Sequence, residues 1–341
     1  MDRVNPTEGA APRYPTDALT LRLSEARLAG APLAIAVLAA LSGALLVLEF
    51  ATGALLALYY RPDRETARAS VQFIVTRVEF GELVRSIHVW GSHALLATLF
   101  ALVGAALFAG LHRKPGEVAW VALVTAWFLA LASAFTGAIL PWTARSSLDA
   151  TVAAEATAKL PLVGPTLRAI VFGAASQPAD LVRTQGIHLG ALPSLWGLVL
   201  LVVVFHALGR LVQDPPREGA KVFPDVVMRA AAACVAVFAG LVALAAWRPA
   251  GLAEAPSAAQ QLTGDVRPNW YLAPIDGLLR VAPPQIVGVS GVTVLVSLAA
   301  VGALAALALP LVDRNGGRLG QRIGLALYAL LLGVMTFALL R

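Results

Sequence analysis

The chain has 341 residues, of which 58% are hydrophobic and only 13% are charged. Soluble domains carry about 25% charged residues. The composition therefore excludes an ordinary soluble or disordered protein and indicates an integral membrane protein. The net charge of +6 would suit nucleic acid, but the arginines are scattered through loops between apolar runs, so no nucleic-acid partner is expected. The single cysteine, Cys234, lies inside an apolar run and excludes a disulfide framework or a zinc cluster.

The chain opens with a polar segment, residues 1–29, which mixes acids, bases and prolines and lacks the apolar core of a signal peptide. After this tail, seven apolar stretches approach the roughly 20 residues needed to span a bilayer. The predicted fold class is therefore an all-α integral membrane protein with about seven transmembrane helices. The stretches cover residues 31–60, 86–110, 117–140, 188–212, 226–247, 287–311 and 321–340.

The loops between these stretches alternate in length and charge. Those at 111–117, 209–225 and 313–322 are short and dense in Arg and Lys, whereas the alternate loops are long and their basic residues are diluted. The positive-inside rule then predicts a multi-pass protein of the cell inner membrane whose N-terminus and short loops are cytoplasmic. Loops as long as the outer ones usually have a function.

Two of the five histidines are placed alike. His88 and His188 each follow a long outer loop and each begin a spanning stretch, so they lie at one depth on two helices, with Arg85 and Arg183 shortly ahead of them. Two imidazoles at one depth on facing helices are typical of a bis-histidine haem in a helical bundle, and arginines at the interface suit the haem propionates. The alternative from spacing alone is that each histidine is an interfacial residue satisfied by a neighbour.

Seven motifs occur in a fixed order along the chain. They are LEFATGALLALYYRP (48–62), RSIH (85–88), FTGAILPW (135–142), LPLVGPTL (160–167), LVRTQGIHLGALP (181–193), RPNWYLAPIDGLLR (267–280) and LPLVDRN (309–315). In this order and at this spacing, the chain from about residue 30 onward resembles cytochrome b, the membrane core of bc-type and bf-type quinol oxidoreductases.

The resemblance implies a four-helix haem domain over residues 30–215 and a three-helix C-terminal domain over residues 216–341. It also implies haem b as cofactor and a quinone as substrate or ligand. A Rieske iron–sulfur protein and a cytochrome c are the expected partners, together with the lipid bilayer and a homodimer or larger complex.

The resemblance is incomplete at the second haem. The family stacks two haems across the membrane, and each haem is held by one histidine from the second helix and one from the fourth. The two histidines on one helix are fourteen or fifteen positions apart, which is about four helical turns. Counting fourteen positions from His88 reaches Leu102, and counting fifteen from His188 reaches Val203, with Val202 as the alternative. The resemblance therefore predicts one haem, near the outer face, between His88 and His188.

Glycines support the same prediction. In the family each porphyrin packs against a glycine on the first helix and another on the third, because only a missing side chain admits the ring so close. Gly53 and Gly137 match the outer pair, whereas the inner pair would fall at Ala39 and Leu123. Leu102, Leu123 and Val203 have side chains that would fill an inner haem pocket.

The remaining histidines offer one alternative. His206 lies about five whole helical turns beyond His188, and it could hold a shifted inner haem with His112 as the only available partner. A position at the cytoplasmic interface is the preferred interpretation for His206. His93 points about 140° away from His88 around the helix, so it is expected to make a polar or interfacial contact and not to bind the same ring.

The outer quinol site also departs from the family. The proton-accepting acid of the PEWY motif is replaced by Asn269, which can hydrogen-bond a quinone but cannot take up its proton. Asp149 and Asp276 are candidate substitute bases, and an ordinary loop or interface acid is the alternative for each. The residues expected in the quinol-site region are Pro268, Asn269, Trp270, Tyr271 and Asp149.

These features predict a cytochrome-b-like electron-transfer subunit of a bc-type quinol:cytochrome c oxidoreductase-like complex, and not an enzyme acting alone. With one haem it would exchange electrons locally with a quinone or redox partner. The alternative is a structural or anchoring subunit of a respiratory or photosynthetic complex with degenerate redox and quinol sites. The NWY segment and the three C-terminal helices count against a third possibility, the haem anchor of a dehydrogenase or hydrogenase.

Overall fold

A computed structural model describes residues 27–28, 33–173, 179–213, 220–256, 269–280, 282–314 and 317–340. The tail expected over residues 1–29 falls almost wholly outside these ranges, and so does Pro268.

Seven helices in the described part of the chain are long and apolar enough to cross a membrane, with mean hydropathy between 1.4 and 2.5. The predicted fold class, an all-α integral membrane protein with about seven spanning helices, is confirmed. The spanning elements are α2 (Leu33–Ala57), α4 (Gly81–Phe108), α5 (Glu117–Ile139), the continuous run of α8 (Leu181–Gly186), η1 (Ile187–Ala191) and α9 (Leu192–Gln213), α10 (Val227–Trp247) preceded by η2 (Val222–Val226), α13 (Gly291–Val312) and α14 (Leu319–Leu340).

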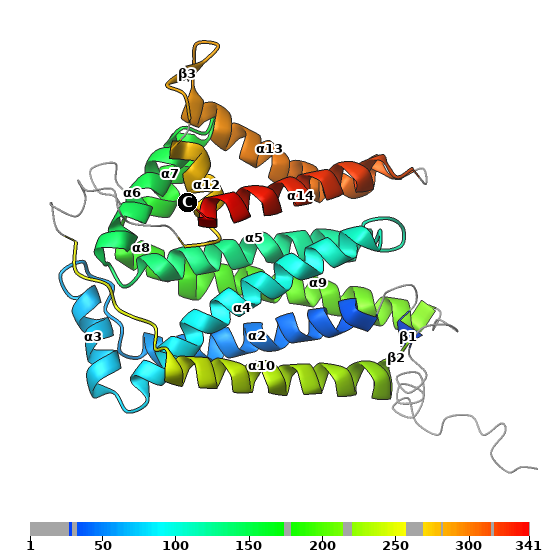
Figure 1. The fold of residues 1–341 in the computed structure, drawn as a ribbon, viewed down its shortest axis with the longest axis horizontal. Helices are drawn as coiled ribbons and strands as arrows, with labels where there is room; N and C mark the ends of the chain where they lie inside the picture. The colour runs from blue at the N-terminus through cyan, green and yellow to red at the C-terminus, as the bar shows by residue number, and fades with distance from the viewer. Residues whose placement is uncertain are drawn as a thin grey trace, which may run out of the picture.

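Shorter elements gather at the two ends of the spanning helices. The end that carries the long loops, called here the long-loop end, holds α3, α6, α7, α12 and a two-stranded hairpin (Figure 1). The opposite, short-loop end holds a second strand pair. These elements are α3 (Ala67–Arg77), α6 (Ala144–Ala158), α7 (Gly164–Phe172), α12 (Ala273–Arg280), β3 (Gln285–Ile286) paired with β4 (Val289–Ser290), and β1 (Arg27–Leu28) paired with β2 (Ala220–Lys221).

Polar residues begin the helices at the long-loop end. The side chain of Thr143 accepts a hydrogen bond from the Ser146 amide, and the Ser146 hydroxyl accepts one from the Thr143 amide, which is a capping box at the start of α6. The Asp180 carboxylate caps α8 through the amides of Val182 and Arg183. The Asp180 cap lets the spanning helix that starts with α8 begin within polar sequence.

Two spanning helices begin earlier than the apolar pattern predicted. His88 lies seven residues after the start of α4 at Gly81, and His188 lies seven residues after the start of α8 at Leu181. Both histidines are therefore about two turns, or roughly 10 Å, inside their helices. They lie at one depth as predicted, but not at the helix ends, because the helices include the polar turns GELVRS and LVRTQG.

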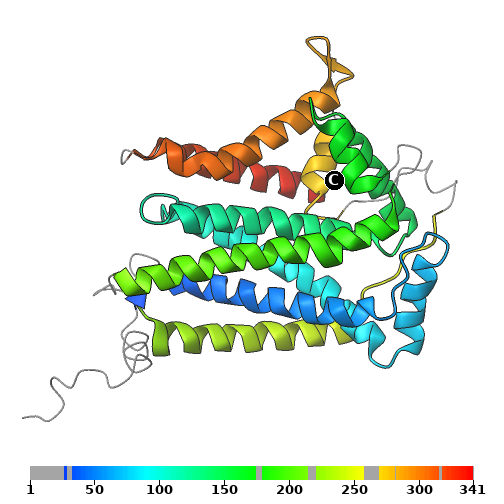
Figure 2. The ribbon, with the colours of Figure 1, turned by 180° about the vertical axis from the view of Figure 1, so that it is seen from behind.

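A four-helix bundle forms the centre of the molecule. In it α2 packs on α4, α4 on α5, and α5 on α9. The three spanning helices after residue 216 flank this bundle on opposite sides: α10 packs on α2 and α4, whereas α13 and α14 pack on α5 and α4 (Figures 1 and 2). The four helices of the bundle are thus enclosed on two sides by the C-terminal helices.

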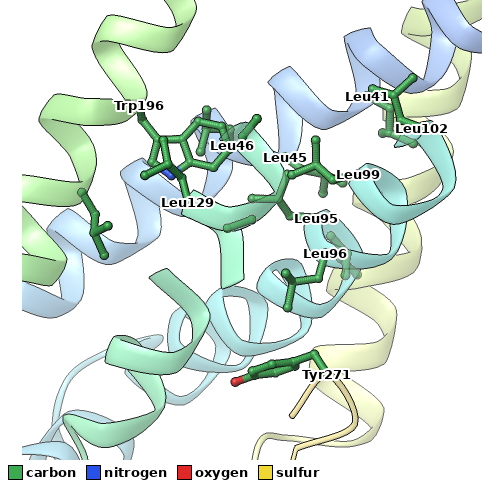
Figure 3. Close-up of a cluster of buried hydrophobic side chains, with 14 of the residues drawn as sticks. Leu41, Leu45, Leu46, Leu95, Leu96, Leu99, Leu102, Leu129, Trp196 and Tyr271 are labelled. Carbon is green, nitrogen blue, oxygen red and sulfur yellow. The ribbon is translucent and has the colours of Figure 1, made fainter. Parts of the chain in front are cut away.

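Leucines fill most of the bundle interior. Leu45, Leu96 and Leu99 are almost fully buried, and Trp196 reaches from α9 into the same cluster (Figure 3). Tyr271 closes the cluster toward the long-loop end. The tertiary fold therefore places the NWY segment directly against the four-helix bundle.

Candidate haem and quinol site

Two Thr-Gly pairs, one on α2 and one on α5, hold the two histidines. The Thr52 hydroxyl lies 2.9 Å from Nδ1 of His88, and the Thr136 hydroxyl lies 3.0 Å from Nδ1 of His188. Each hydroxyl also donates to a carbonyl of its own helix, Leu48 at 2.7 Å and Ala132 at 2.8 Å. The two halves of the site are thus built alike.

One tautomer of each imidazole satisfies every contact in this pattern. A threonine hydroxyl has a single hydrogen, and when that hydrogen goes to the helix carbonyl the threonine oxygen is free to accept from the histidine. With the proton on Nδ1 both contacts of each threonine are hydrogen bonds, and the lone pair of the imidazole is then on Nε2. A neutral imidazole with a free Nε2 is a metal ligand whose orientation is set by its second nitrogen.

Glycines allow the rings to approach α2 and α5. A Cβ added at Gly53 would lie 3.1 Å from Cε1 of His88, and one at Gly137 would lie 2.9 Å from Cε1 of His188. Both separations are shorter than ordinary van der Waals contact, so a side chain at either position would displace an imidazole or any group beside it. The outer glycine pair predicted from the sequence therefore lines the histidine site.

The spacing of the two rings fits a metal between them. Their centroids lie 6.5 Å apart, and two metal–imidazole bonds of about 2.0 Å plus roughly 1.1 Å within each ring require about 6 Å. No cluster of three or more metal-binding side chains occurs in the described ranges, so the candidate metal is one that needs only two protein ligands. The iron of haem fits this donor set.

The histidines open into a large pocket at the long-loop end. Its volume is about 740 Å³, within the range typical of ligand sites. It joins the two imidazoles to three of the residues predicted to bind quinol, Asp149, Asn269 and Tyr271, whereas Trp270 is not among its lining residues. Among the residues that line it are Gly53, Arg85, His88, His93, Gly137, Arg145, Asp149, His188, Asn269 and Tyr271.

The two arginines predicted to bind propionates differ in position. Arg85 lines the pocket, where its guanidinium donates to the carbonyls of Ala250 and Gly251. Arg183 is exposed and donates to the Ile170 carbonyl at 3.2 Å, and it is not among the pocket's lining residues. Arg85 is therefore the better placed of the two to pair with an anionic group at the edge of a bound ring.

A buried carboxylate beside His88 was not singled out from the sequence. Oε2 of Glu49 lies 3.2 Å from Nδ1 of His88, and Oε1 is buried without a hydrogen-bond partner. Gly91 makes room for it, because a Cβ there would lie 2.3 Å from Oε1. The signal was available: Glu49 is the only charged residue in α2, and an acid inside a membrane span is a functional candidate.

His93 lies in the same pocket as the quinol-site residues. The indole N–H of Trp270 donates to Nδ1 of His93 at 2.9 Å, and the His93 ring lies 6.0 Å from that of Tyr271. The polar contact expected for His93 is thus a contact with the NWY segment. Since Nδ1 accepts, the neutral ring carries its proton on Nε2.

The Asn269 amide is directed back into its own segment. It donates to the Tyr271 hydroxyl at 3.1 Å, and that hydroxyl lies 3.3 Å from the Ala134 carbonyl. Burial raises the pKa of Tyr271 above its ordinary value, so the phenol is not a base. Neither residue can take up a proton from quinol.

The two candidate substitute bases have different partners, and only Asp149 lines the pocket, although the charge of Asp276 is near enough to raise the pKa of Asp149. Asp149 lines the pocket, 3.7 Å from the Arg145 guanidinium, and burial raises its pKa although Arg145 opposes the shift. Two nitrogens of Arg145 are buried without hydrogen-bond partners. Asp276 instead forms an exposed ion pair with Arg280 at 2.6 Å, one turn apart on α12.

At the level predicted for an inner haem, aliphatic side chains surround a smaller cavity. Ala39, Leu102, Leu123 and Val203 all line one cavity of about 250 Å³, and Val202 does not. The π-helical turn η1 at His188 accounts for the choice of Val203. A π turn inserts one extra residue into a helix. Fifteen positions from His188 along α9 therefore cover about the same rise as fourteen positions from His88 along α4.

The histidines of the shifted-haem alternative have other surroundings. His112 is fully buried, and its Nε2 lies 2.9 Å from the Asp313 carboxylate at the short-loop end. Asp313 also accepts from the amides of Gly320 and Gln321. His112 therefore connects the loop after α4 to the turn between α13 and α14, and its Nε2 is taken by Asp313.

Comparison with known proteins agrees with the motifs. Residues 32–210 match the family model described as cytochrome b/b6/petB. The chain belongs to the cytochrome b family. It is 35% identical over 151 residues to cytochrome b6 of Heliomicrobium gestii, covering 44% of this chain and 70% of that protein. It is 30% identical over 265 residues to cytochrome b of Allochromatium vinosum, covering 70% and 64%.

Two further matches extend this cytochrome b assignment. A menaquinol:cytochrome c reductase cytochrome b subunit of Bacillus subtilis is 31% identical over 147 residues, covering 42% of this chain and 66% of that subunit. A chain of a hyperthermophilic respiratory Complex III superimposes with a TM-score of 0.64 over 93% of both chains, at 17% sequence identity. The second match supports the fold alone, and it extends over the C-terminal helices.

Proposed function

We propose that this cytochrome b is the electron-transfer subunit of a bc-type quinol:cytochrome c oxidoreductase and carries one haem b, near the outer face of the cell inner membrane. The observation that supports one haem best is the contrast between the two levels of the bundle. The upper level has two histidines, each with Nδ1 against a threonine hydroxyl and its ring against a glycine. The lower level has only aliphatic residues at the matching positions.

Residues 30–215 then form the haem domain and residues 216–341 the C-terminal domain, with the N-terminus and the short loops in the cytoplasm. The dense Arg and Lys of the short loops support this orientation. The long-loop end, with the haem and quinol residues, faces outward, where a Rieske iron–sulfur protein and a cytochrome c would dock. A homodimer or larger complex is part of this proposal.

In the pocket each residue has a separate task. The haem, when bound, accepts and releases single electrons. His88 and His188 would hold it through Nε2, while Thr52 and Thr136 keep the protons on Nδ1. Arg85 would face its anionic edge. Because the histidines and Asp149 line one pocket, quinol bound there lies close to both.

Asp149 is the proton acceptor in this proposal. Of the two acids that line the pocket, Glu49 lies against His88 and Asp149 lies on the side of Asn269 and Tyr271. The Asp149 carboxylate would take the proton of a quinol hydroxyl, as the PEWY acid does in the family, and Arg145 lies beside it to hold the carboxylate in place. His93, with its proton on Nε2, can donate a hydrogen bond to a quinone carbonyl. Electron exchange would remain local, since no relay leads across the bilayer.

The test is haem content together with a redox titration of the purified protein. One haem b per chain with a single midpoint potential is expected, and His88→Ala and His188→Ala should each abolish it. His206→Ala is the matched control, because it removes a histidine from α9 and should leave the spectrum unchanged. Two haems per chain, or none, would overturn the proposal.

A structural or anchoring subunit remains the second candidate, and it is favoured by one observation: the hydrogen bond between Asn269 and Tyr271 leaves the NWY segment without a base. Quinol oxidation by the purified complex distinguishes the two. Turnover lost in Asp149→Asn but kept in Asp276→Asn supports the redox function. Equal turnover in both variants, or none in the native complex, supports the structural one.

A further inference from the structure

A second cavity lies toward the short-loop end of the bundle, between α2, α4, α5 and α9. Its lining is almost wholly hydrocarbon. The polar side chain of Ser42 is satisfied by the Leu38 carbonyl at 2.9 Å. A cavity without free polar groups does not retain water. Leu46, Leu95 and Trp196 line both cavities and separate this one from the histidine pocket (Figure 3).

The size of the cavity suits a chain and not a ring system. Its volume of about 250 Å³ is one third of the 740 Å³ of the histidine pocket. Its lining runs from Ile35 to Leu46 along α2, which is about 16 Å of helix. A volume of this size spread over that length makes the cavity narrow, which suits a flexible hydrocarbon chain better than a flat ring. Leu99, Leu102 and Leu123 narrow it.

One side of the cavity faces outward. The helix pairs α2–α4, α4–α5 and α5–α9 are in contact, whereas α2 and α9 are not among the packed pairs of the described chain. At this gap Ala39 on α2 and Leu200 and Val203 on α9 are both exposed and part of the lining. These residues lie within spanning helices, so the gap opens toward the hydrocarbon of the bilayer.

We propose that this cavity binds one acyl chain of a membrane phospholipid, which enters between α2 and α9. Void volume in a protein interior loses dispersion contacts, and lipid chains are the apolar groups present at high concentration at the opening. The bound chain would pack against Leu99 and Trp196 and support α9 against α2. The inference rests on the proposed absence of an inner haem.

Photo-crosslinking tests this directly. The full chain is reconstituted in vesicles of phosphatidylcholine and phosphatidylglycerol that contain a phosphatidylcholine with a diazirine in its acyl chain. Crosslinked residues are then mapped by mass spectrometry. We expect labelling of Leu99 and Trp196, which are 3% and 4% exposed and out of reach of lipid outside the bundle. Leu201, which is 52% exposed, reports general lipid contact.

Gly43 and Gly197 provide a matched pair of variants. Gly43 lines the cavity and Gly197 does not, and a Cβ at either meets nothing within 4 Å. Gly43→Leu should reduce the labelling of Leu99 and Trp196 at least fivefold, whereas Gly197→Leu should leave it unchanged. Labelling of Leu201 should persist in both.

Three results would overturn the inference. The first is labelling of Leu201 without labelling of Leu99 or Trp196. The second is buried labelling that Gly43→Leu does not reduce. The third is complete loss of the buried label on adding an isoprenoid quinone, which would make a quinone tail the occupant. A count of two haems per chain overturns the proposed function as well, whereas one haem without buried labelling overturns the lipid site alone.

Discussion

At the scale of single residues, the site depends on how each polar atom is satisfied inside an apolar bundle. Thr52 and Thr136 hold the two histidines in one tautomer, but their surroundings differ. Nδ1 of His88 also lies 3.2 Å from Glu49, so it has a second acceptor. Each ring also has a backbone hydrogen bond, His88 with Glu49 and His188 with Ser133, but among side chains of the described residues Thr136 is the only acceptor at Nδ1 of His188.

This difference predicts unequal effects of removing the two hydroxyls. Thr136→Val should weaken haem binding by about 10- to 100-fold, the usual cost of losing a partner of a ligand histidine, and Thr52→Val should weaken it less. Haem retention during titration with apo-protein acceptor, read from the absorption spectrum, measures both. Thr98→Val on α4 is the control, because its hydroxyl bonds only the Ala94 carbonyl. Equal losses in all three variants would contradict the assignment.

Asp149 predicts a dependence of quinol oxidation on pH. Its pKa is raised by burial, so the carboxylate is protonated, and unable to accept a proton, up to a higher pH than an ordinary aspartate. Turnover should therefore rise as the pH passes upward through this pKa. Asp149→Asn should lower turnover by roughly 100-fold and abolish the rise. Asp149→Glu should restore part of it, and a pH profile unchanged by Asp149→Asn would exclude this role.

At the scale of elements, the site depends on how closely helices approach. α5 approaches the imidazole of His188 through Gly137, and α2 approaches that of His88 through Gly53. His188 lies in the π turn η1, at the level of His88. The extra residue of this turn shifts the sequence register of the following helix α9 by one position relative to a regular α-helix. Local helix geometry therefore decides which residue of α9 faces the lower cavity.

Gly137→Ala tests the helix approach. A methyl group placed 2.9 Å from Cε1 of His188 must displace the ring, so haem content should fall and the midpoint potential should shift. Gly197→Ala on α9 is the control, because its Cβ would meet nothing within 4 Å, and it should leave haem content unchanged. If the Gly137→Ala variant binds as much haem as the native protein, the imidazole rings can move without a loss of haem binding.

At the scale of the whole molecule, a buried contact between His112 and Asp313 joins the four-helix bundle to the C-terminal helices. His112 and Asp313 have no exposed side-chain surface, and Asp313 also orders the turn into α14 through the Gly320 and Gln321 amides. At the same interface, the Tyr328 hydroxyl of α14 donates to the Phe100 carbonyl of α4 at 3.0 Å.

Asp313→Ala should lower stability substantially, because removal of one partner from a buried pair costs about 3–5 kcal/mol. Asp276→Ala removes an acid from an exposed ion pair one turn apart on α12, and such pairs contribute about 0.3–0.5 kcal/mol. Thermal unfolding of the purified protein in detergent compares the two variants. Similar midpoints for both would show that the His112 contact does not hold the C-terminal helices to the four-helix bundle.

Much of this protein follows from the sequence, for reasons that are local. Apolar length determines the spanning helices. The spacing along one helix determines depth, so His88 and His188 could be placed at one level, and Leu102 and Val203 at the level below. Glycine beside threonine in LEFATG and FTGAIL indicated where a flat group could approach.

The tertiary structure alone decided which distant residues meet. Glu49 faces His88, Trp270 binds His93, Asp149 and not Asp276 enters the pocket, and His112 pairs with Asp313 across 201 residues of sequence. The gap between α2 and α9 is likewise a property of packing. Helix periodicity determines depth and direction along one element, whereas the partner across an interface depends on how several helices fill space together.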